Sequence, residues 1–317
     1  MKSLQMSGLY PATVTPFRSD LSIDKAALER HISEVAKPQG VSGVVVNGGI
    51  GELLTLKVSE QAEIVRLARR VVRPGQTVIA GIEARLADDA VAAASAVKAA
   101  GAEALLVLPP FDIRAYRKLS TDIPSVLAYF QRLDQEVGLP IVIFQYPQHT
   151  GCSYTIEVLQ ALAELDSLVA IKVAAESFSI YLPVWETLRD KLAILAASDS
   201  PPLFEMLAHG AHGAMIGIST IETPIWTEIL VHTNRGEPVP AHLKSAALHI
   251  MDGVFENQKR QGLIGDPAAT KEALFQLGRI PSSRVRPPAK TANDSDKRKI
   301  RQGLQGARLL VADAAAS

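Results

Sequence analysis

The stretch Val169-Ala170-Ile171-Lys172 decides how the rest of the chain is interpreted. Three consecutive apolar residues predict a short strand that is buried on both faces, and a cation fits such a strand only at its carboxyl end or beside a partner. Lys172 therefore marks an open end of the core. Desolvation favours the neutral amine, which attacks a carbonyl carbon to form a Schiff base. Lys172 is thus a candidate nucleophile, and a lysine that only reaches out to water is the competing interpretation.

The composition fits a globular enzyme that acts on a small molecule. Of 317 residues, 47% are hydrophobic and 21% are charged, so a sizeable core is available. The 33 basic and 33 acidic residues balance, and no net field favours nucleic acid or an anionic membrane. The single cysteine, Cys152, cannot form an internal disulfide, and neither a signal peptide nor a membrane span is visible. We expect a cytoplasmic protein with no nucleic-acid or membrane partner.

Short apolar runs alternate along the chain with segments of helical periodicity. The runs predict strands at residues 8–17, 44–46, 77–82, 104–108, 141–144, 169–172, 192–196 and 213–218. Helices are predicted between them at residues 24–37, 59–72, 88–100, 123–137, 155–165, 179–189 and 201–209. Asp24 is the expected cap of the first helix, and Gly210 ends the last one.

The number of these units distinguishes two α/β architectures. Eight units of strand and helix predict a closed (β/α)8 TIM barrel with a parallel sheet. A doubly wound open sheet would begin with a glycine-rich dinucleotide loop, which Pro16-Phe17-Arg18-Ser19-Asp20 is not. Helices predicted at residues 241–258, 268–277 and 297–311 form a C-terminal helical extension, with an irregular crossing segment at 284–296. We expect a barrel domain over residues 1–222 and a helical domain over residues 223–317.

Barrel enzymes build their sites at the carboxyl ends of the strands. In this chain those ends are residues 47–52, 109–111, 145–151, Lys172, Asp199 and residues 216–217. Several of these positions are glycine, which allows backbone amides to approach an anion. Lys172 is expected to point into this ring of loops.

Several motifs occur in an order that resembles one enzyme family. They are Tyr10-Pro11-Ala12-Thr13-Val14-Thr15-Pro16-Phe17, the loop from Gly48 to Glu52, Pro147-x-x-Thr150-Gly151, Ile171-Lys172, Gly210-Ala211-His212-Gly213 and Arg286-Pro287-Pro288. The pattern covers nearly the whole chain and resembles the dihydrodipicolinate synthase and N-acetylneuraminate lyase family. The resemblance implies a barrel with a C-terminal helical domain, a homotetramer built as a dimer of dimers, and a class I aldolase mechanism with Lys172 as the Schiff-base lysine.

The chain departs from the family's pattern where that pattern carries hydroxyl groups. Two hydroxyl residues of the family's glycine loop are Gly49 and Ile50 here. The relay tyrosine of the fifth strand is Phe144, and a tyrosine pair after the fourth strand, one of which the neighbouring subunit lends, is Phe111 and Asp112. The hydroxyls of the relay are missing together. The chain is therefore expected to be a divergent member rather than a true dihydrodipicolinate synthase.

Two residues after the fifth strand are candidates to replace the relay. Tyr146 lies two residues after Phe144, so both side chains project to the same face of an extended strand. His149 stands where the family often has an arginine, and it can exchange protons near neutral pH. Loss of that arginine weakens any claim to a dicarboxylic second substrate. Packing alone for Tyr146, and a solvated loop position for His149, are the competing interpretations.

The predicted activity is that of a Schiff-base-forming lyase, an aldolase or a dehydratase, that acts on a 2-oxo acid such as a sugar acid or a substituted pyruvate. Lys172 would form an iminium that holds the carbanion as an enamine, with Tyr146 and His149 completing the catalytic set. The amides of the glycine loop are the expected carboxylate site. The predicted substrate-binding residues are Gly48, Gly49, Ile50, Phe111, Phe144, Ile216 and Gly217.

Two other functions stay open. The barrel could bind sugar acids without catalysis. Asp199-Ser200 and residues 213–217 lie where many barrels hold phosphate, so a phosphosugar enzyme is the second alternative, although no lysine or arginine is near that loop. The histidines lack metal-ligand spacing, and we expect no metal and no cofactor. Lys98 and Lys271 are predicted to lie on solvated helix faces.

Overall fold

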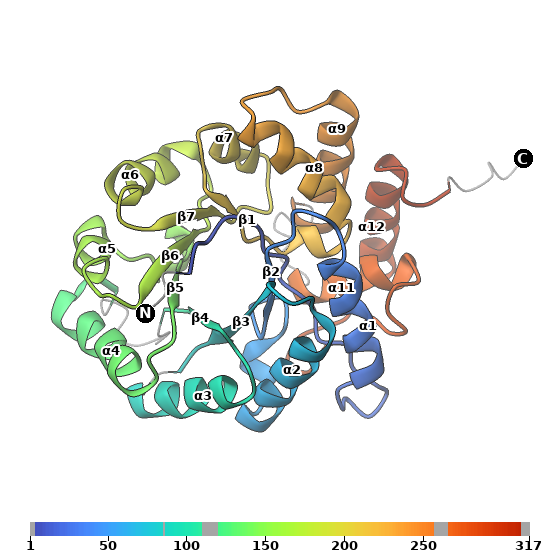
Figure 1. The fold of residues 1–317 in the computed structure, drawn as a ribbon. Coiled ribbons are helices and arrows are strands. Elements are labelled where there is room, and N and C mark those ends of the chain that lie inside the picture. Colours follow the sequence, from blue (N-terminus) through green and yellow to red (C-terminus); the bar gives the residue numbers. More distant parts are fainter. Residues whose placement is uncertain (1–3, 85, 110–119, 257–265, 312–317) are drawn as a thin grey trace, which may run out of the picture.

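Eight parallel strands form a ring in the part of the chain that the structure describes (Figure 1). The computed structural model describes residues 4–84, 86–109, 120–256 and 266–311. The hydrogen-bonded order is β1-β8-β7-β6-β5-β4-β3-β2, and parallel bridges from Leu9 to Val41 and from Ala12 to Val45 close the ring. The predicted (β/α)8 TIM barrel is confirmed. The strands are β1 Gly8–Leu9, β2 Gly43–Val46, β3 Thr77–Ile82, β4 Ala104–Val107, β5 Ile141–Gln145, β6 Leu168–Val173, β7 Ala193–Ala196 and β8 Gly213–Ala214.

A helix follows each strand and covers the outside of the ring (Figure 1). The first begins where the sequence predicts, because the Asp24 carboxylate accepts a hydrogen bond of 3.0 Å from the Ala27 N–H. The helices of the barrel are α1 Lys25–Ala36, α2 Val58–Val71, α3 Ala87–Ala99, α4 Ile123–Glu136, α5 Ile156–Leu162, α6 Phe178–Leu188, α7 Pro202–Ala208 and α8 Thr223–Asn234.

Strand side chains alternate between the barrel interior and the surrounding helices. In β6, Ala170 belongs to the interior cluster, whereas Ile171 packs in the layer under the helices. In β5, Phe144 lies in the interior and Ile143 lies under the helices. Lys172 comes two residues after Ala170, so the pleat directs it to the interior at the carboxyl end of β6.

The C-terminal helices gather on one side of the barrel (Figure 1). They are α9 Ala241–Ile250, the π-helical segment η5 Met251–Glu256, α11 Asp266–Gln276 and α12 Asp294–Gly306. Helix α12 contacts α9, η5 and α11, while α8 contacts both α7 of the barrel and α9. The domain boundary between residues 222 and 223 stays a prediction. Among the helices of the described ranges, none combines the length and the apolar composition needed to cross a membrane.

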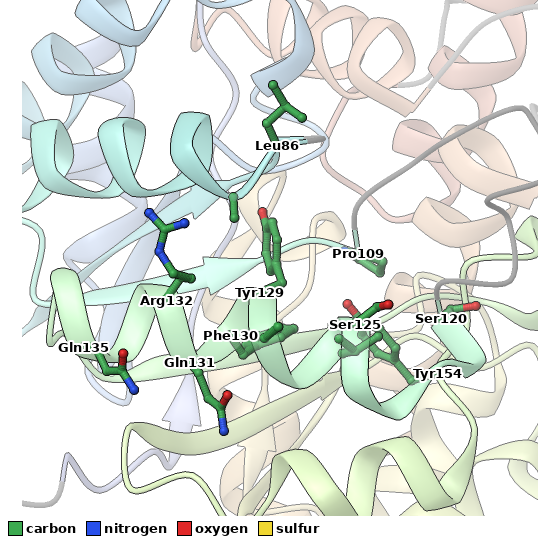
Figure 2. Close-up of a pocket in the computed structure, with 13 residues that line it drawn as sticks. Leu86, Pro109, Ser120, Ser125, Tyr129, Phe130, Gln131, Arg132, Gln135 and Tyr154 are labelled. Atoms are coloured by element: carbon green, nitrogen blue, oxygen red, sulfur yellow. The ribbon is translucent and has the colours of Figure 1, made fainter.

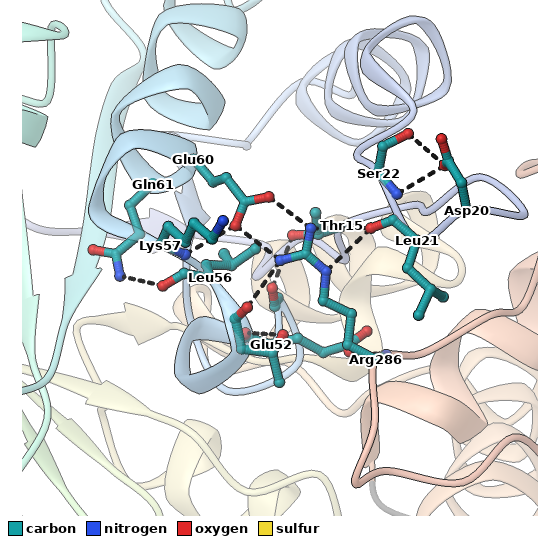
Figure 3. Close-up of polar contacts among 12 residues, drawn as sticks. Thr15, Asp20, Leu21, Ser22, Glu52, Leu56, Lys57, Glu60, Gln61 and Arg286 are labelled. Atoms are coloured by element: carbon teal, nitrogen blue, oxygen red, sulfur yellow. Dashed lines mark hydrogen bonds and ion pairs between the residues drawn. The ribbon is translucent and has the colours of Figure 1, made fainter.

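Charged residues join the C-terminal region to the barrel (Figure 3). The Arg286 guanidinium donates to Glu60 of α2 at 2.6 and 2.8 Å and to the carbonyl oxygen of Leu21 at 3.0 Å. Lys271 of α11 forms an ion pair with Glu52 and is 0% exposed. The predicted solvent position of Lys271 is therefore wrong, because its partner lies 219 residues away in the sequence.

Several element boundaries also differ from the prediction. The first strand, predicted over residues 8–17, is only Gly8–Leu9. The last strand ends at Ala214 rather than at residue 218, because the chain turns into the short helix η4 Ile218–Thr220. Helix α12 begins three residues before the predicted position 297. Its start is fixed by a reciprocal cap, in which Asn293 accepts from the Asp296 N–H at 2.9 Å and Asp296 accepts from the Asn293 N–H at 3.1 Å.

Candidate active site

Lys172 lies at the carboxyl end of β6, inside the barrel. Its Cα is paired with that of Phe144 on β5 and that of Leu195 on β7. The residue is 8% exposed, and its Nζ lies 3.9 Å from the centroid of the Phe144 ring. Burial lowers the pKa of Lys172 to about 8, and the negative charge of Asp199 opposes this shift. The amine is therefore accessible in its neutral, nucleophilic form near physiological pH.

The loops after β2, β7 and β8 meet beside this lysine. The Asp199 carboxylate accepts a hydrogen bond of 2.9 Å from the Ile218 N–H, which ties the end of β7 to the end of β8. A Cβ added to Gly217 would lie 3.3 Å from the Ile50 side chain and 3.5 Å from Asp199. The structure thus brings together Ile50 and Gly217, two of the predicted substrate-binding residues. Ile216 and Ile50 are both buried here.

The glycine loop after β2 follows a constrained backbone path. Asn47 begins it with a positive φ of 55°, and Glu52 ends it with a φ of 61°. Gly81 of β3 permits this path, because a Cβ there would lie 1.9 Å from the Asn47 carbonyl oxygen. Gly49 is exposed, and a Cβ on it would meet no heavy atom within 4 Å. The backbone at Gly49 is therefore open to a ligand.

Tyr146 stacks on Phe144, with ring centroids 4.3 Å apart and an interplanar angle of 21°. The alternation predicted from the sequence is therefore present, since both rings lie on one face of the strand end. Burial, followed by the negative charge of Glu83, raises the pKa of Tyr146 well above its usual range. The phenol stays protonated near neutral pH, so Tyr146 is a hydrogen-bond donor.

A cavity of about 420 Å³ opens at the carboxyl ends of β2 to β5. Because Tyr146 forms part of its wall and stacks on Phe144, the cavity neighbours the lysine. Its size is that of a small-ligand site. The described residues of the wall are mainly apolar: Gly49, Glu52, Leu53, Leu54, Thr55, Glu83, Leu108, Pro109, Tyr146, Thr150, Cys152, Pro267 and Ala289.

His149 lies apart from these residues. Its side chain is 71% exposed, and its Nδ1 is 2.6 Å from a carboxylate oxygen of Glu176. The same carboxylate accepts from the backbone N–H groups of Gln148 and His149 at 3.3 and 3.2 Å. These contacts hold the loop after β5 at the surface. Phe111, another predicted site residue, lies outside the described residues.

A larger cavity, of about 610 Å³, lies between α4 and the start of α3 (Figure 2). Tyr129 and Arg132 of α4 border it, and the Tyr129 hydroxyl donates to the carbonyl oxygen of Ala84 at 3.1 Å. Its wall comes mainly from helix side chains, and none of the predicted catalytic residues lines the described part of it. Tyr146, which stacks on the Phe144 ring beside Lys172, borders the smaller cavity and not this one.

Glu83 is the site residue that the sequence did not single out. It follows β3 directly and forms part of the cavity wall. None of the motifs quoted from the sequence includes it. Its position just after a strand could have identified it, because the residues that follow each strand of a barrel all lie on the same face of the barrel. Asp199 was found by that rule.

The reactivity of Lys172 is expected to follow its lowered pKa. Below pH 8 the rate of iminium formation should rise about tenfold per pH unit, and it should level off above pH 8, because only the neutral amine attacks. Asp199→Asn should move the midpoint to lower pH, since it removes a charge that favours the protonated amine. The rate of borohydride-trapped adduct formation as a function of pH measures both. A midpoint near 10.5, the ordinary value, would contradict the assignment.

A buried lysine of lowered pKa on a barrel, beside a cavity and an open glycine loop, is the arrangement that a Schiff-base-forming lyase requires. Comparison with known proteins gives the same class. Residues 5–307 match the dihydrodipicolinate synthetase family. The chain belongs to this family, and it is a class I lyase.

Individual relatives cover almost the whole chain. The 4-hydroxy-tetrahydrodipicolinate synthase of Anaplasma marginale (strain Florida) is 28% identical over 309 residues, which are 97% of each chain. A protein of Rhizobium meliloti described as an uncharacterized DapA-like lyase is 29% identical over 311 residues, with 96% of this chain and 97% of that protein covered. The solved dihydrodipicolinate synthase of Acinetobacter baumannii, complexed with pyruvate, has a TM-score of 0.83 at 22% identity and covers 96% of this chain and 99% of its own. That likeness concerns the fold.

Proposed function

We propose that this chain is an aldolase or hydro-lyase that forms an iminium between Lys172 and the keto carbon of a 2-oxo acid. The observation that carries the proposal is the buried Lys172 amine, whose pKa is lowered to about 8 at the carboxyl end of a barrel strand. A buried amine with that pKa is costly to maintain, and nucleophilic catalysis uses it. Family membership supports the same role.

The proposed chemistry uses an electron sink. The neutral amine attacks the keto carbon, water leaves, and a cationic iminium forms. Breaking the bond between the third and fourth carbons, or removing a proton from the third carbon, places the electron pair in an enamine. After cleavage the enamine is protonated. In the dehydration the enamine instead expels the hydroxyl of the fourth carbon, which leaves with a proton as water, and a conjugated iminium remains. Hydrolysis of the iminium then returns the lysine in either case. Aldol cleavage and dehydration share this intermediate, so one site serves either reaction.

The substrate carboxylate is assigned to the amides of the glycine loop. Gly49 is open to the cavity, and the Ile50 side chain fills the space beside Gly217. Together with Phe144, Ile50 gives the floor an apolar character. We therefore propose a sugar acid or an aryl-substituted pyruvate as substrate, rather than pyruvate plus an aldehyde that carries a second carboxylate. His149 stands where the family often has an arginine, and its exposed position against Glu176 supports this choice.

Tyr146 is the proposed proton donor of the site. Its raised pKa keeps the phenol protonated, and its ring lies in the cavity wall on the Phe144 ring. The homotetramer and the cytoplasmic location remain proposals. The first rests on the family resemblance and the second on the single cysteine.

The experiment that tests the function is intact-mass spectrometry after borohydride reduction with a panel of pyruvate, sugar acids and aryl pyruvates. We expect a mass increase equal to the acid minus one water plus the two hydrogens that borohydride reduction adds to the iminium, and the acid that labels at the lowest concentration identifies the substrate class. If folded protein forms an adduct with none of the acids in the panel, the proposal is refuted.

The two candidates for proton transfer are expected to behave differently. Tyr146→Phe keeps the stacked ring but removes the hydroxyl, and it should lower kcat by about 100-fold, the ordinary size of a lost acid–base group. His149→Ala removes an exposed contact with Glu176 and should change kcat by less than about threefold. Steady-state kinetics with the best substrate of the panel measures both. Equal losses in the two variants would restore His149 to the catalytic set.

A further inference from the structure

We propose that the buried ion pair between Lys271 and Glu52 positions the backbone amide of Ile50 for the substrate carboxylate, so that the C-terminal helices set the affinity of the barrel for 2-oxo acids. The inference rests on the proposed function, because it takes the amides of the glycine loop as the carboxylate site. Lys271 and Glu52 are positioning residues here, and neither is assigned a contact with the reacting atoms.

The first step of the argument is the orientation of one peptide group. The Glu52 N–H donates to the Gly49 carbonyl oxygen at 3.1 Å. That carbonyl belongs to the same planar peptide as the Ile50 N–H, and the two groups point in opposite directions. The hydrogen bond from Glu52 therefore fixes the direction in which the Ile50 N–H points. A rotation of Glu52 would re-aim that amide.

The second step is that Glu52 needs support. Its φ of 61° is a left-handed conformation that a residue with a Cβ seldom adopts unless its surroundings hold it there. The support comes from its carboxylate. One oxygen is bound by the Lys271 ammonium. The other accepts a hydrogen bond of 2.9 Å from the Arg286 N–H, and Figure 3 shows Glu52 and Arg286 side by side. Both donors belong to the C-terminal region.

The third step concerns Lys271, which is held rigidly itself. It is 0% exposed, its Nζ donates to the Arg284 carbonyl oxygen at 2.8 Å, and it lies 4.0 Å from the centroid of the Phe17 ring. The Lys271 ammonium therefore has one geometry. Because Glu52 also forms part of the cavity wall, this geometry reaches the ligand site directly.

Docking of the C-terminal region does not by itself explain this pair. Two buried charges can often be replaced by apolar residues without loss of stability, so a buried ion pair contributes little to holding two parts of a protein together. Arg286 already joins the same surfaces through Glu60, Leu21 and the Thr55 carbonyl oxygen. The additional effect of the ion pair between Lys271 and Glu52 is to fix the conformation of Glu52 at the end of the glycine loop.

The test compares two charge-removing variants with a matched control. The principal variant is Glu52→Gln with Lys271→Met, which leaves no unpaired buried charge and keeps an acceptor for the Arg286 N–H. Lys271→Met alone is the second variant. Glu60→Gln is the control, because it weakens the same docking surface through Arg286 but leaves the contacts of Glu52 in place.

Two labelling measurements separate carboxylate binding from lysine reactivity. The first is the pyruvate concentration that gives half-maximal borohydride adduct. The second is the labelling rate with hydroxyacetone, a ketone of similar size without a carboxylate. We expect the half-saturating pyruvate concentration to rise about tenfold in both charge-removing variants, and hydroxyacetone labelling to stay within about twofold of the wild type. The Glu60→Gln control should match the wild type in both measurements.

The proposal is overturned if pyruvate saturation is unchanged in the double variant, or if hydroxyacetone labelling falls in the same proportion as pyruvate labelling. It is also overturned if Glu60→Gln weakens pyruvate binding as much as the double variant does, because docking would then explain the effect. These outcomes leave the proposed function intact, since wild-type protein labelled by pyruvate establishes it separately. If pyruvate does not label the wild type, the acid of the panel that labels best takes its place in both measurements. A folded wild type that no acid of the panel labels would refute the function and this inference together.

Discussion

Lys172→Met is expected to abolish both turnover and the borohydride adduct. Methionine matches the length of the lysine side chain and packs well against an aromatic ring, so the neighbouring Phe144 keeps its contact. The thioether cannot form an iminium, and we expect kcat to fall by at least about a thousandfold. Intact-mass spectrometry and steady-state kinetics on the same preparation measure the two losses.

The same substitution is expected to stabilise the fold. The folded-state pKa of Lys172, about 8, lies below its ordinary value of 10.5, so at pH 7 the folded protein carries a buried charge that the unfolded chain holds more easily. Removing that charge should raise the free energy of unfolding at pH 7 by about 1–3 kcal/mol. The benefit should be full below pH 8 and should decline between pH 8 and 10.5, because over that range folding of the wild type releases a proton that the unfolded chain still holds. Opposite changes in activity and stability are the signature of a strained functional group.

Lys172→Arg provides the control for charge. Arginine keeps a cation at the position but does not lose its proton in proteins, so it should be as inactive as the methionine variant without the gain in stability. An adduct that persists in either variant would place the nucleophile on another lysine.

The fold was predictable because its signals are local. The strand at residues 77–82 was predicted with the boundaries that β3 has, since an apolar run between turn residues contains all the information needed. The start of α12 was predicted too late, because its reciprocal cap between Asn293 and Asp296 was not recognised. The shortness of β8 has a non-local cause, since the Ile218 N–H bonds to Asp199 of the preceding loop.

Some residues of the candidate site could also be predicted from local sequence, and others could not. Lys172 could be located from its strand, and the glycine loop from its sequence. The role of Lys271 could not be found, because nothing in α11 distinguishes a lysine that meets Glu52 from one that faces water. Glu83 was missed for a related reason, since its effect on Tyr146 depends on two strand ends that meet only in the closed barrel. Pairings across the barrel require the fold first.

Gly81→Ala is expected to be the most destabilising small substitution near the site. A Cβ on Gly81 would lie 1.9 Å from the carbonyl oxygen and 2.7 Å from the carbonyl carbon of Asn47, and 3.2 Å from the Gly48 nitrogen. All three atoms are backbone, so no side-chain rotation can relieve the overlap. The free energy of unfolding should fall by about 3 kcal/mol or more, the upper range for overpacking in a closed core.

The loss should extend to ligand binding, because the only way to relieve the overlap is to move the start of the glycine loop away from β3. Asn47 is held in its left-handed conformation by a hydrogen bond of 3.1 Å from its side-chain amide to the Gln61 carbonyl oxygen, so the displacement would pass to Gly48 and Gly49. Urea denaturation and pyruvate saturation of the adduct measure the two effects. Gly49→Ala is the matched control for stability, since its Cβ would meet no atom within 4 Å and should cost less than about 0.5 kcal/mol. Equal stability of the two variants would show that the loop can leave β3 freely, and the close contact at Gly81 would then not determine where the carboxylate-binding amides lie.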